Sequence, residues 1–198
     1  MEMPTRYGMK RGKKKQYFMV KAPDFLGGKD LHYVIANNPE GLIGRNIEVI
    51  LYDLTDDLDH QFIKVKLKII EVKDFYAYTR YNGHEYFREY ERSLIMRGTS
   101  YVKAIRDVET KDGGRFRVRS SVFTTKRITN SRKKAIRRQV FKVLDKWASS
   151  TDSKSFIREV LFGKVNDEIS EAAKKVYPIR EGSGIFKIKV LKWPGIDI

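Results

Sequence analysis

The sequence predicts an α+β fold: a strand-rich, mostly antiparallel and barrel-like sheet, with a short inserted helix and C-terminal helices packed on it. Two observations carry this prediction. Apolar residues follow strand patterns through much of residues 17–123, and from residue 131 onward they recur at helical spacing. We expect a basic N-terminal arm (1–16), a strand-rich core (17–130) and a C-terminal part (131–198) that packs with the core as one globular unit.

The first strands are expected at residues 17–20 and 47–53. A further strand pattern runs over residues 72–80 and bends at residues 73–74. Asn82-Gly83 then supplies the dipeptide that is typical of a hairpin turn.

Residues 61–71 give the clearest strand pattern in the chain, because apolar residues alternate there with Lys64, Lys66 and Lys68. Such alternation is typical of a half-buried antiparallel strand. The three lysines have two interpretations that the sequence does not separate. They protect an edge strand from aggregation, or they contact RNA.

A short helix is expected at residues 87–97, ended by Gly98 in a left-handed conformation. A strand at 102–109 and a turn at 111–114 then predict a hairpin onto the strand that starts at residue 115. In that strand arginines 115, 117 and 119 alternate with Phe116 and Val118. One face would therefore carry three guanidinium groups, while the other faces the core.

A helix with Asn130 or Ser131 as its N-cap follows, because apolar residues recur at Ile136, Val140, Val143, Leu144 and Trp147. A second helix begins after Thr151 or Asp152 and is interrupted at Gly163 before the pattern resumes over 169–176. Residues 185–191 alternate again and predict a last strand or an extended tail.

The most informative feature is that residues 113–144 contain eleven Lys and Arg and no Asp or Glu. A helix N-terminus favours acidic side chains, by ~0.3–1 kcal/mol each, and a solvated helix face normally mixes charges of both signs. A bound polyanion explains the pattern better than a solvated face. We therefore expect Lys134, Arg137 and Arg138 to point outward toward nucleic acid.

Composition supports an anionic partner, since the formal net charge is +16 over 198 residues. The arm alone holds six cations and one acid, and is expected to contact RNA. The predicted RNA-binding residues are Lys13, Lys14, Lys15, Lys64, Lys66, Lys68, Arg115, Arg117, Arg119, Lys126, Arg127, Arg132, Lys133, Lys134, Arg137 and Arg138.

Several classes of function find no support in the sequence. There is no cysteine, which excludes disulfides and thiol chemistry, and no apolar run approaches the length of a membrane span. The carboxylates of residues 53–59 lack the spacing of a calcium loop, and hairpin turns favour Asp in any case. The histidines are scattered, and no nucleotide-binding or hydrolase motif occurs. We expect no catalytic residue, metal or cofactor, and a soluble, intracellular protein.

Particular segments resemble a known family, in order and spacing, from about residue 22 to residue 191. They are 42–45 (LIGR), 51–55 (LYDLT), 83–85 (GHE), 92–94 (RSL), 97–100 (RGTS), 110–113 (TKDG) and 177–180 (YPIR). The family is the small-subunit ribosomal protein of archaea and eukaryotes called S-three-A-e, or eukaryotic-type S-one. The chain departs from the family pattern at Glu89, where Asp is expected before the tyrosine, and the tail at 193–198 matches no family feature.

The resemblance implies a structural protein of the small ribosomal subunit, located in the cytoplasm, with a barrel-like centre and packed helices. It implies a place on the platform, near the messenger exit and the 3′ end of the small-subunit rRNA. Expected partners are this rRNA, neighbouring ribosomal proteins and messenger RNA near the exit. Two alternatives remain: a metal-dependent enzyme acting on RNA through residues 53–59, and an RNA chaperone or translation regulator outside the ribosome.

Overall fold

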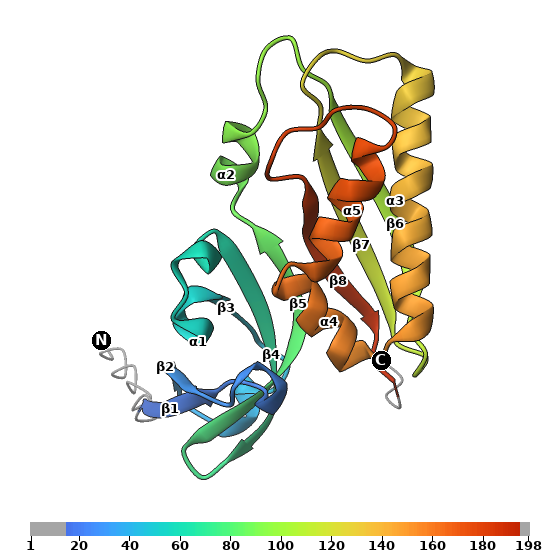
Figure 1. The fold of residues 1–198 in the computed structure, drawn as a ribbon. Coiled ribbons are helices and arrows are strands. Elements are labelled where there is room, and N and C mark those ends of the chain that lie inside the picture. Colours follow the sequence, from blue (N-terminus) through green and yellow to red (C-terminus); the bar gives the residue numbers. More distant parts are fainter. Residues whose placement is uncertain (1–14, 195–198) are drawn as a thin grey trace, which may run out of the picture.

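The computed structural model describes residues 15–194 and confirms an α+β fold with a mostly antiparallel sheet (Figure 1). Its strands are β1 (Gln16–Lys21), β2 (Asp30–Ala36), β3 (Asn46–Ile50), β4 (Ile63–Lys73), β5 (Tyr76–Tyr86), β6 (Tyr101–Glu109), β7 (Arg115–Phe123) and β8 (Gly184–Lys192). Its α-helices are α1 (Tyr52–Thr55), α2 (Arg88–Ser93), α3 (Asn130–Ser150), α4 (Ser153–Leu161) and α5 (Lys164–Lys174). Short 3-10 helices lie at η1 (Asp24–Leu26), η2 (Pro39–Leu42) and η3 (Leu58–His60).

Strand β5 connects the two halves of the molecule. Along one edge it pairs with β4, and β4 in turn pairs with β3. Its other edge is shared, because β1 pairs with residues 76–78 in parallel and β8 pairs with residues 83–85 antiparallel. The open sheet therefore runs β2-β1-β5-β8-β7-β6. Figure 1 shows β1 to β4 gathered in one half and the long helices in the other.

The buried apolar residues form one cluster that runs through both halves, and in the second half it lies between the sheet and the helices. Ile136, Val140 and Leu144 of α3 are completely buried, and so are Phe116 and Val118 of β7. The apolar stripe and the strand alternation thus face the core as predicted. Helix α3 lies along β6, the end strand of the sheet order, and covers it (Figure 1). Within residues 15–194 no helix combines the length and apolar character needed to span a membrane.

The prediction of a turn at Asn82-Gly83 was wrong, because both residues lie inside β5. The hairpin turns instead at residues 74–75, where Asp74 has a φ of 53°. Gly83 is needed for a different reason. Its φ is 142°, and a Cβ built there would lie 2.4 Å from the carbonyl oxygen of Ile188. Only glycine lets β8 approach β5 so closely.

Three element boundaries also differ from the prediction. Strand β3 ends at Ile50, since residues 52–55 turn into α1. Helix α2 ends at Ser93, so Gly98, although left-handed with a φ of 76°, lies in a later turn. The N-cap of α3 is Thr129 and not Asn130 or Ser131. Strand β2 was not predicted at all.

Candidate nucleic-acid interface

The arginine row of β7 is neutralised by acids from other parts of the chain. Antiparallel pairing with β6 sets Arg115 opposite Glu109 and Arg117 opposite Asp107. Arg115 Nε lies 3.2 Å from Glu109, and Arg117 donates two hydrogen bonds of 2.7 Å to Asp107. The absence of acids in the local sequence therefore does not leave this row unpaired.

Arg119 is held more deeply than the other two arginines. Its guanidinium donates a 2.9 Å hydrogen bond to Glu91 of α2, and both side chains are mostly buried. Burial opposes ionisation of Glu91, but hydrogen bonds from Tyr101, Arg119 and Ser121 outweigh it and lower the pKa of the carboxyl group. Burial, followed by the hydrogen bond to Glu91, raises the pKa of Tyr101 to about 12. This network fixes α2 onto β6 and β7, so Arg119 has a structural role.

The lysines of β4 lie on an internal strand, because β4 pairs with β3 on one side and with β5 on the other. The edge-protection interpretation was therefore wrong. Lys64 lies 2.9 Å from Glu48, and Lys66 lies 2.7 Å from Glu85. Burial opposes ionisation of Glu85, but hydrogen bonds from Lys187 and Lys66 outweigh it and lower the pKa to about 2. Lys68 has no ion pair within the described residues.

A second group of cations does lack acidic partners. It comprises seven side chains in the loop before α3 and in that helix as far as residue 142, which we call the α3 basic surface: Lys126, Arg127, Arg132, Lys133, Lys134, Arg138 and Lys142. Within residues 15–194 none of them forms an ion pair. All are exposed except Lys133, which is half-buried. Arg132 lies over the ring of Tyr177 at 5.2 Å.

Arg137 does not belong to this surface, contrary to the prediction that it points outward. It is half-buried, and its Nε donates a 2.8 Å hydrogen bond to the backbone carbonyl of Lys103 in β6. Arg106 of β6 reaches back to Asp145 of α3 with bonds of 3.0 and 3.2 Å. These contacts dock the helix on the end strand, so Arg137 is structural.

The N-terminus of α3 adds to the positive potential of this surface. Thr129 makes no side-chain capping bond, and the first turn contains no acid. The first backbone N–H groups therefore remain available, together with the positive end of the helix dipole. Phosphate oxygens suit such a site.

The loop after α5 and the loop after α2 lie near the end of the molecule where α3 begins (Figure 1). Thr124 forms an isolated bridge with Ile179, and Arg180 donates to the carbonyl of Leu94. The loop after α5 is thus fixed beside the start of α3. It follows the exposed cations Lys174 and Lys175, which sequence reasoning did not assign. Two adjacent lysines at the end of a predicted helix were the sequence signal that could have identified them as candidate RNA contacts.

Two predicted residues, Lys13 and Lys14, lie outside the described residues, and Lys15 is exposed just before β1. The carboxylates of residues 53–59 serve local structure. Asp57 accepts from the backbone N–H of Asp59 at 3.1 Å, and Asp56 pairs with Lys29. The part of the chain that the structure describes holds no group of three or more such side chains placed to bind a metal ion.

Comparison with known proteins decides the family. The model of the Ribosomal S3Ae family matches residues 9–194. The chain belongs to this family. Relatives named "Small ribosomal subunit protein eS1" include one from Pyrobaculum islandicum, 44% identical over 91% of this chain and 81% of its own length. Another from Methanopyrus kandleri is 39% identical over 92% of this chain and 88% of its own. A third, from Desulfurococcus amylolyticus, is 40% identical over 92% and 85%.

Membership of the Ribosomal S3Ae family confirms the resemblance on which the functional prediction relied. The matched range includes every described element. The family consists of structural proteins of the ribosome and not of enzymes, in agreement with the prediction for this chain.

Proposed function

We propose that this protein is a structural constituent of the small ribosomal subunit and that it binds small-subunit rRNA through the α3 basic surface. The observation that carries the proposal is the contrast between two sets of cations. Most of the cations on β4 and β7 form ion pairs with carboxylates. The seven cations of the α3 basic surface have no acidic partner within the described residues. Phosphate contacts position a protein on RNA without requiring a pocket.

The contribution of each predicted residue follows from its pairing. Lys126, Arg127, Arg132, Lys133, Lys134 and Arg138 would contact phosphates directly, with Lys142 added by the structure. Arg115, Arg117, Lys64 and Lys66 would first have to leave their carboxylates, so we assign them minor roles. Lys13, Lys14 and Lys15 remain proposed RNA contacts, because the sequence that precedes β1 is strongly basic.

The finer location rests on the family resemblance. We place the protein on the platform, near the messenger exit and the 3′ end of the small-subunit rRNA, in the cytoplasm with the ribosome. Neighbouring ribosomal proteins and messenger RNA are the further partners.

The absence of cysteine makes a direct test possible. A single cysteine at exposed Ser131, carrying an iron chelate, would cut nearby rRNA by hydroxyl radicals after incorporation into subunits. Ser149 is also exposed, ~27 Å away on the same helix at 1.5 Å per residue, and serves as the matched control. We expect strong rRNA cleavage from residue 131 and weaker or different cleavage from residue 149. Equal or absent cleavage from both would contradict the proposed surface.

A regulator outside the ribosome is tested by sedimentation. A constituent stays with small subunits through a high-salt wash, whereas a loosely bound factor is released. Assaying the purified protein for RNA cleavage in the presence of Mg²⁺ tests the enzyme alternative.

A further inference from the structure

The outer face of the N-terminal half carries exposed tyrosines on three neighbouring strands. They are Tyr17 of β1, Tyr33 of β2, and Tyr76 and Tyr78 of β5, which we call the tyrosine face. Tyr17 and Tyr33 are each 62% exposed, and Tyr76 and Tyr78 are 43% and 37% exposed. Large exposed aromatic rings that gather on one surface mark an interaction site.

Strand register places these rings on one side of the sheet. Tyr33 is opposite Met19 in β1, and Met19 is opposite Tyr76 in β5. Tyr78 is opposite Lys21, two positions further along both strands. At spacings of ~4.8 Å between strands and ~6.6 Å between alternate residues, Tyr33, Tyr76 and Tyr78 lie within about 10 Å of their neighbours. The intervening residues Phe18, Val20 and Ala77 are buried on the opposite side.

Core packing does not account for these tyrosines. None of the four hydroxyl groups has a hydrogen-bond partner within residues 15–194. The sheet buries its other side, so this side could be entirely polar without loss to the core. Tyrosine is favoured in strands, yet strand propensity does not explain why four of them share one exposed face.

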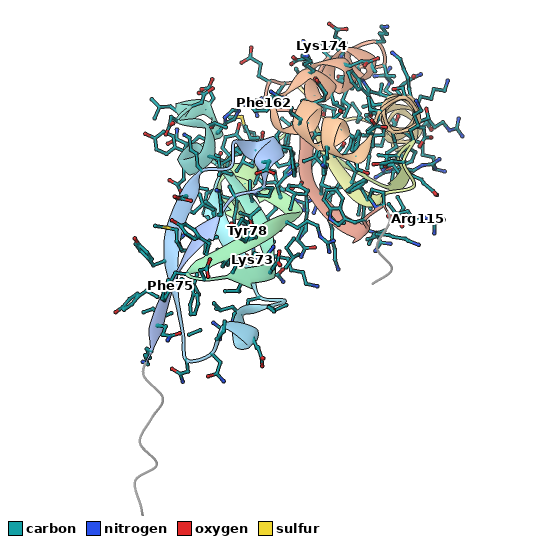
Figure 2. All side chains as sticks on the ribbon, turned by 90° about the horizontal axis from the view of Figure 1, so that it is seen from below. Lys73, Phe75, Tyr78, Arg115, Phe162 and Lys174 are labelled. Carbon is teal, nitrogen blue, oxygen red and sulfur yellow. The ribbon has the colours of Figure 1, made fainter. Side chains whose placement is uncertain are left out.

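The charges on the same face are mainly positive. Lys21, Lys68, Lys73 and Arg80 accompany the tyrosines, whereas the acids there are Asp30 and Glu71, and Glu71 is paired with Lys73 at 2.9 Å. Figure 2 shows Lys73 close to Tyr78. Strand β1 also continues directly from residues 1–15, which contain six cations and one acid. Ile35, opposite Tyr17, is also exposed on this side of the sheet. The excess of cations over acids there favours a polyanion as the partner.

We propose that the tyrosine face binds an unpaired RNA strand without strong sequence preference, by stacking bases on the rings while the neighbouring cations hold the phosphates. Every base has a flat face, so stacking tolerates any sequence. Duplex RNA hides those faces inside its helix and would not bind here. The tyrosine face is a different surface from the start of α3, on the other half of the molecule. This inference rests on the proposed function as an RNA-binding constituent.

The first test uses the full chain and compares RNA affinity when positions 33 and 76 carry aromatic rings and when they carry aliphatic side chains. Tyr33→Leu/Tyr76→Leu removes the rings, and Tyr33→Phe/Tyr76→Phe keeps them as the matched control. The probe is a labelled, non-self-complementary RNA of about ten nucleotides, within the ~4–16 that one single-strand-binding fold covers. Stacking contributes roughly 5- to 150-fold per base. The Leu variant should therefore lose at least about tenfold in affinity, while the Phe variant and binding to a duplex stay unchanged. Leu and Phe variants that bind alike would overturn the inference.

A second variant separates this inference from the proposed function. Lys126→Gln/Arg127→Gln, on the α3 basic surface, should weaken binding of single strands and duplexes alike. If this Gln variant weakens binding while the Leu variant binds single strands normally, the proposal for the tyrosine face is wrong and the proposed function stands. If neither variant changes binding, both are wrong.

The last measurement uses the unmodified protein in intact small subunits and so does not depend on how any variant folds. After ultraviolet irradiation, peptides containing Tyr33 or Tyr76 should carry cross-linked nucleotides. Chemical cross-links from this face to a neighbouring protein, with no nucleotide adducts, would show that a protein covers it and would reject the inference.

Discussion

The α3 basic surface can be tested by removing two charges that support no other contact. In Lys134→Gln/Arg138→Gln both side chains are exposed and neither has an ion pair within the described residues. Glutamine has a helix propensity close to that of Lys and Arg. The two cations are four positions apart, so their removal also relieves a repulsion of ~0.2–0.5 kcal/mol.

The expected effects on stability and on binding have opposite signs. For a chain of this length 1 kcal/mol corresponds to about 2–4 °C, so the melting temperature should stay level or rise by up to about 2 °C. If each cation contacts one phosphate, the slope of log K against log salt should become shallower by about 1.4–1.8. That change corresponds to roughly a twentyfold loss of RNA affinity near physiological salt.

Two single variants of the same helix serve as controls. Arg137→Gln breaks the bond to the Lys103 carbonyl and should cost ~0.5–1.5 kcal/mol of stability, with little direct effect on RNA. Ile136→Ala, in the core, should cost ~2–5 kcal/mol. Thermal melting and fluorescence anisotropy over a salt series measure both quantities. A double Gln variant that melts several degrees early while binding RNA normally would refute the reasoning, because the surface would then be structural.

Three further predictions concern other parts of the chain. Asp56→Asn/Asp57→Asn should fold and enter subunits almost normally, because exposed pairs contribute ~0–1 kcal/mol; loss of a tightly bound metal, detected by elemental analysis, would contradict this. Burial lowers the pKa of His84 to about 4, so protonation favours the unfolded chain. Stability should fall by ~2 kcal/mol between pH 7 and 5, and His84→Gln should flatten that slope in urea melts. Gly83→Ala should destabilise by ~3 kcal/mol or more, because its Cβ would clash with the Ile188 carbonyl; a wild-type melting temperature would show that β8 can move away.

Features that depend on local pattern were predictable from the sequence. The alternation in residues 61–71 and the β6–β7 hairpin follow from neighbouring residues, and so does the buried stripe of α3. Each of these signals lies within one element and its flanking turns. The pairing and register of strands that are distant in the sequence have no such local signal and could not be predicted.

The candidate interface was only partly predictable for the same reason. Arg115, Arg117 and Arg119 looked unpaired because their stretch of sequence holds no acid, yet Glu109, Asp107 and Glu91 reach them through tertiary structure. Arg137 looked outward-facing by helical angle, but a long side chain can bend back to a neighbouring carbonyl. The tyrosine face could not be predicted from the sequence, because its residues come together only through the pairing of β2, β1 and β5.

The position of β8 has a consequence for the order in which the chain can fold during synthesis. This strand lies between β5 and β7, although it is made more than sixty residues after β7 begins. Until it emerges, one edge of β7 and residues 83–85 of β5 lack their strand partner, and such edges invite association with other chains. The nascent protein is therefore most vulnerable to aggregation in the interval before residues 184–192 leave the ribosome. An early stop or a slow stretch of translation in α4 or α5 would lengthen that interval, and we expect chaperones to be needed most at that stage.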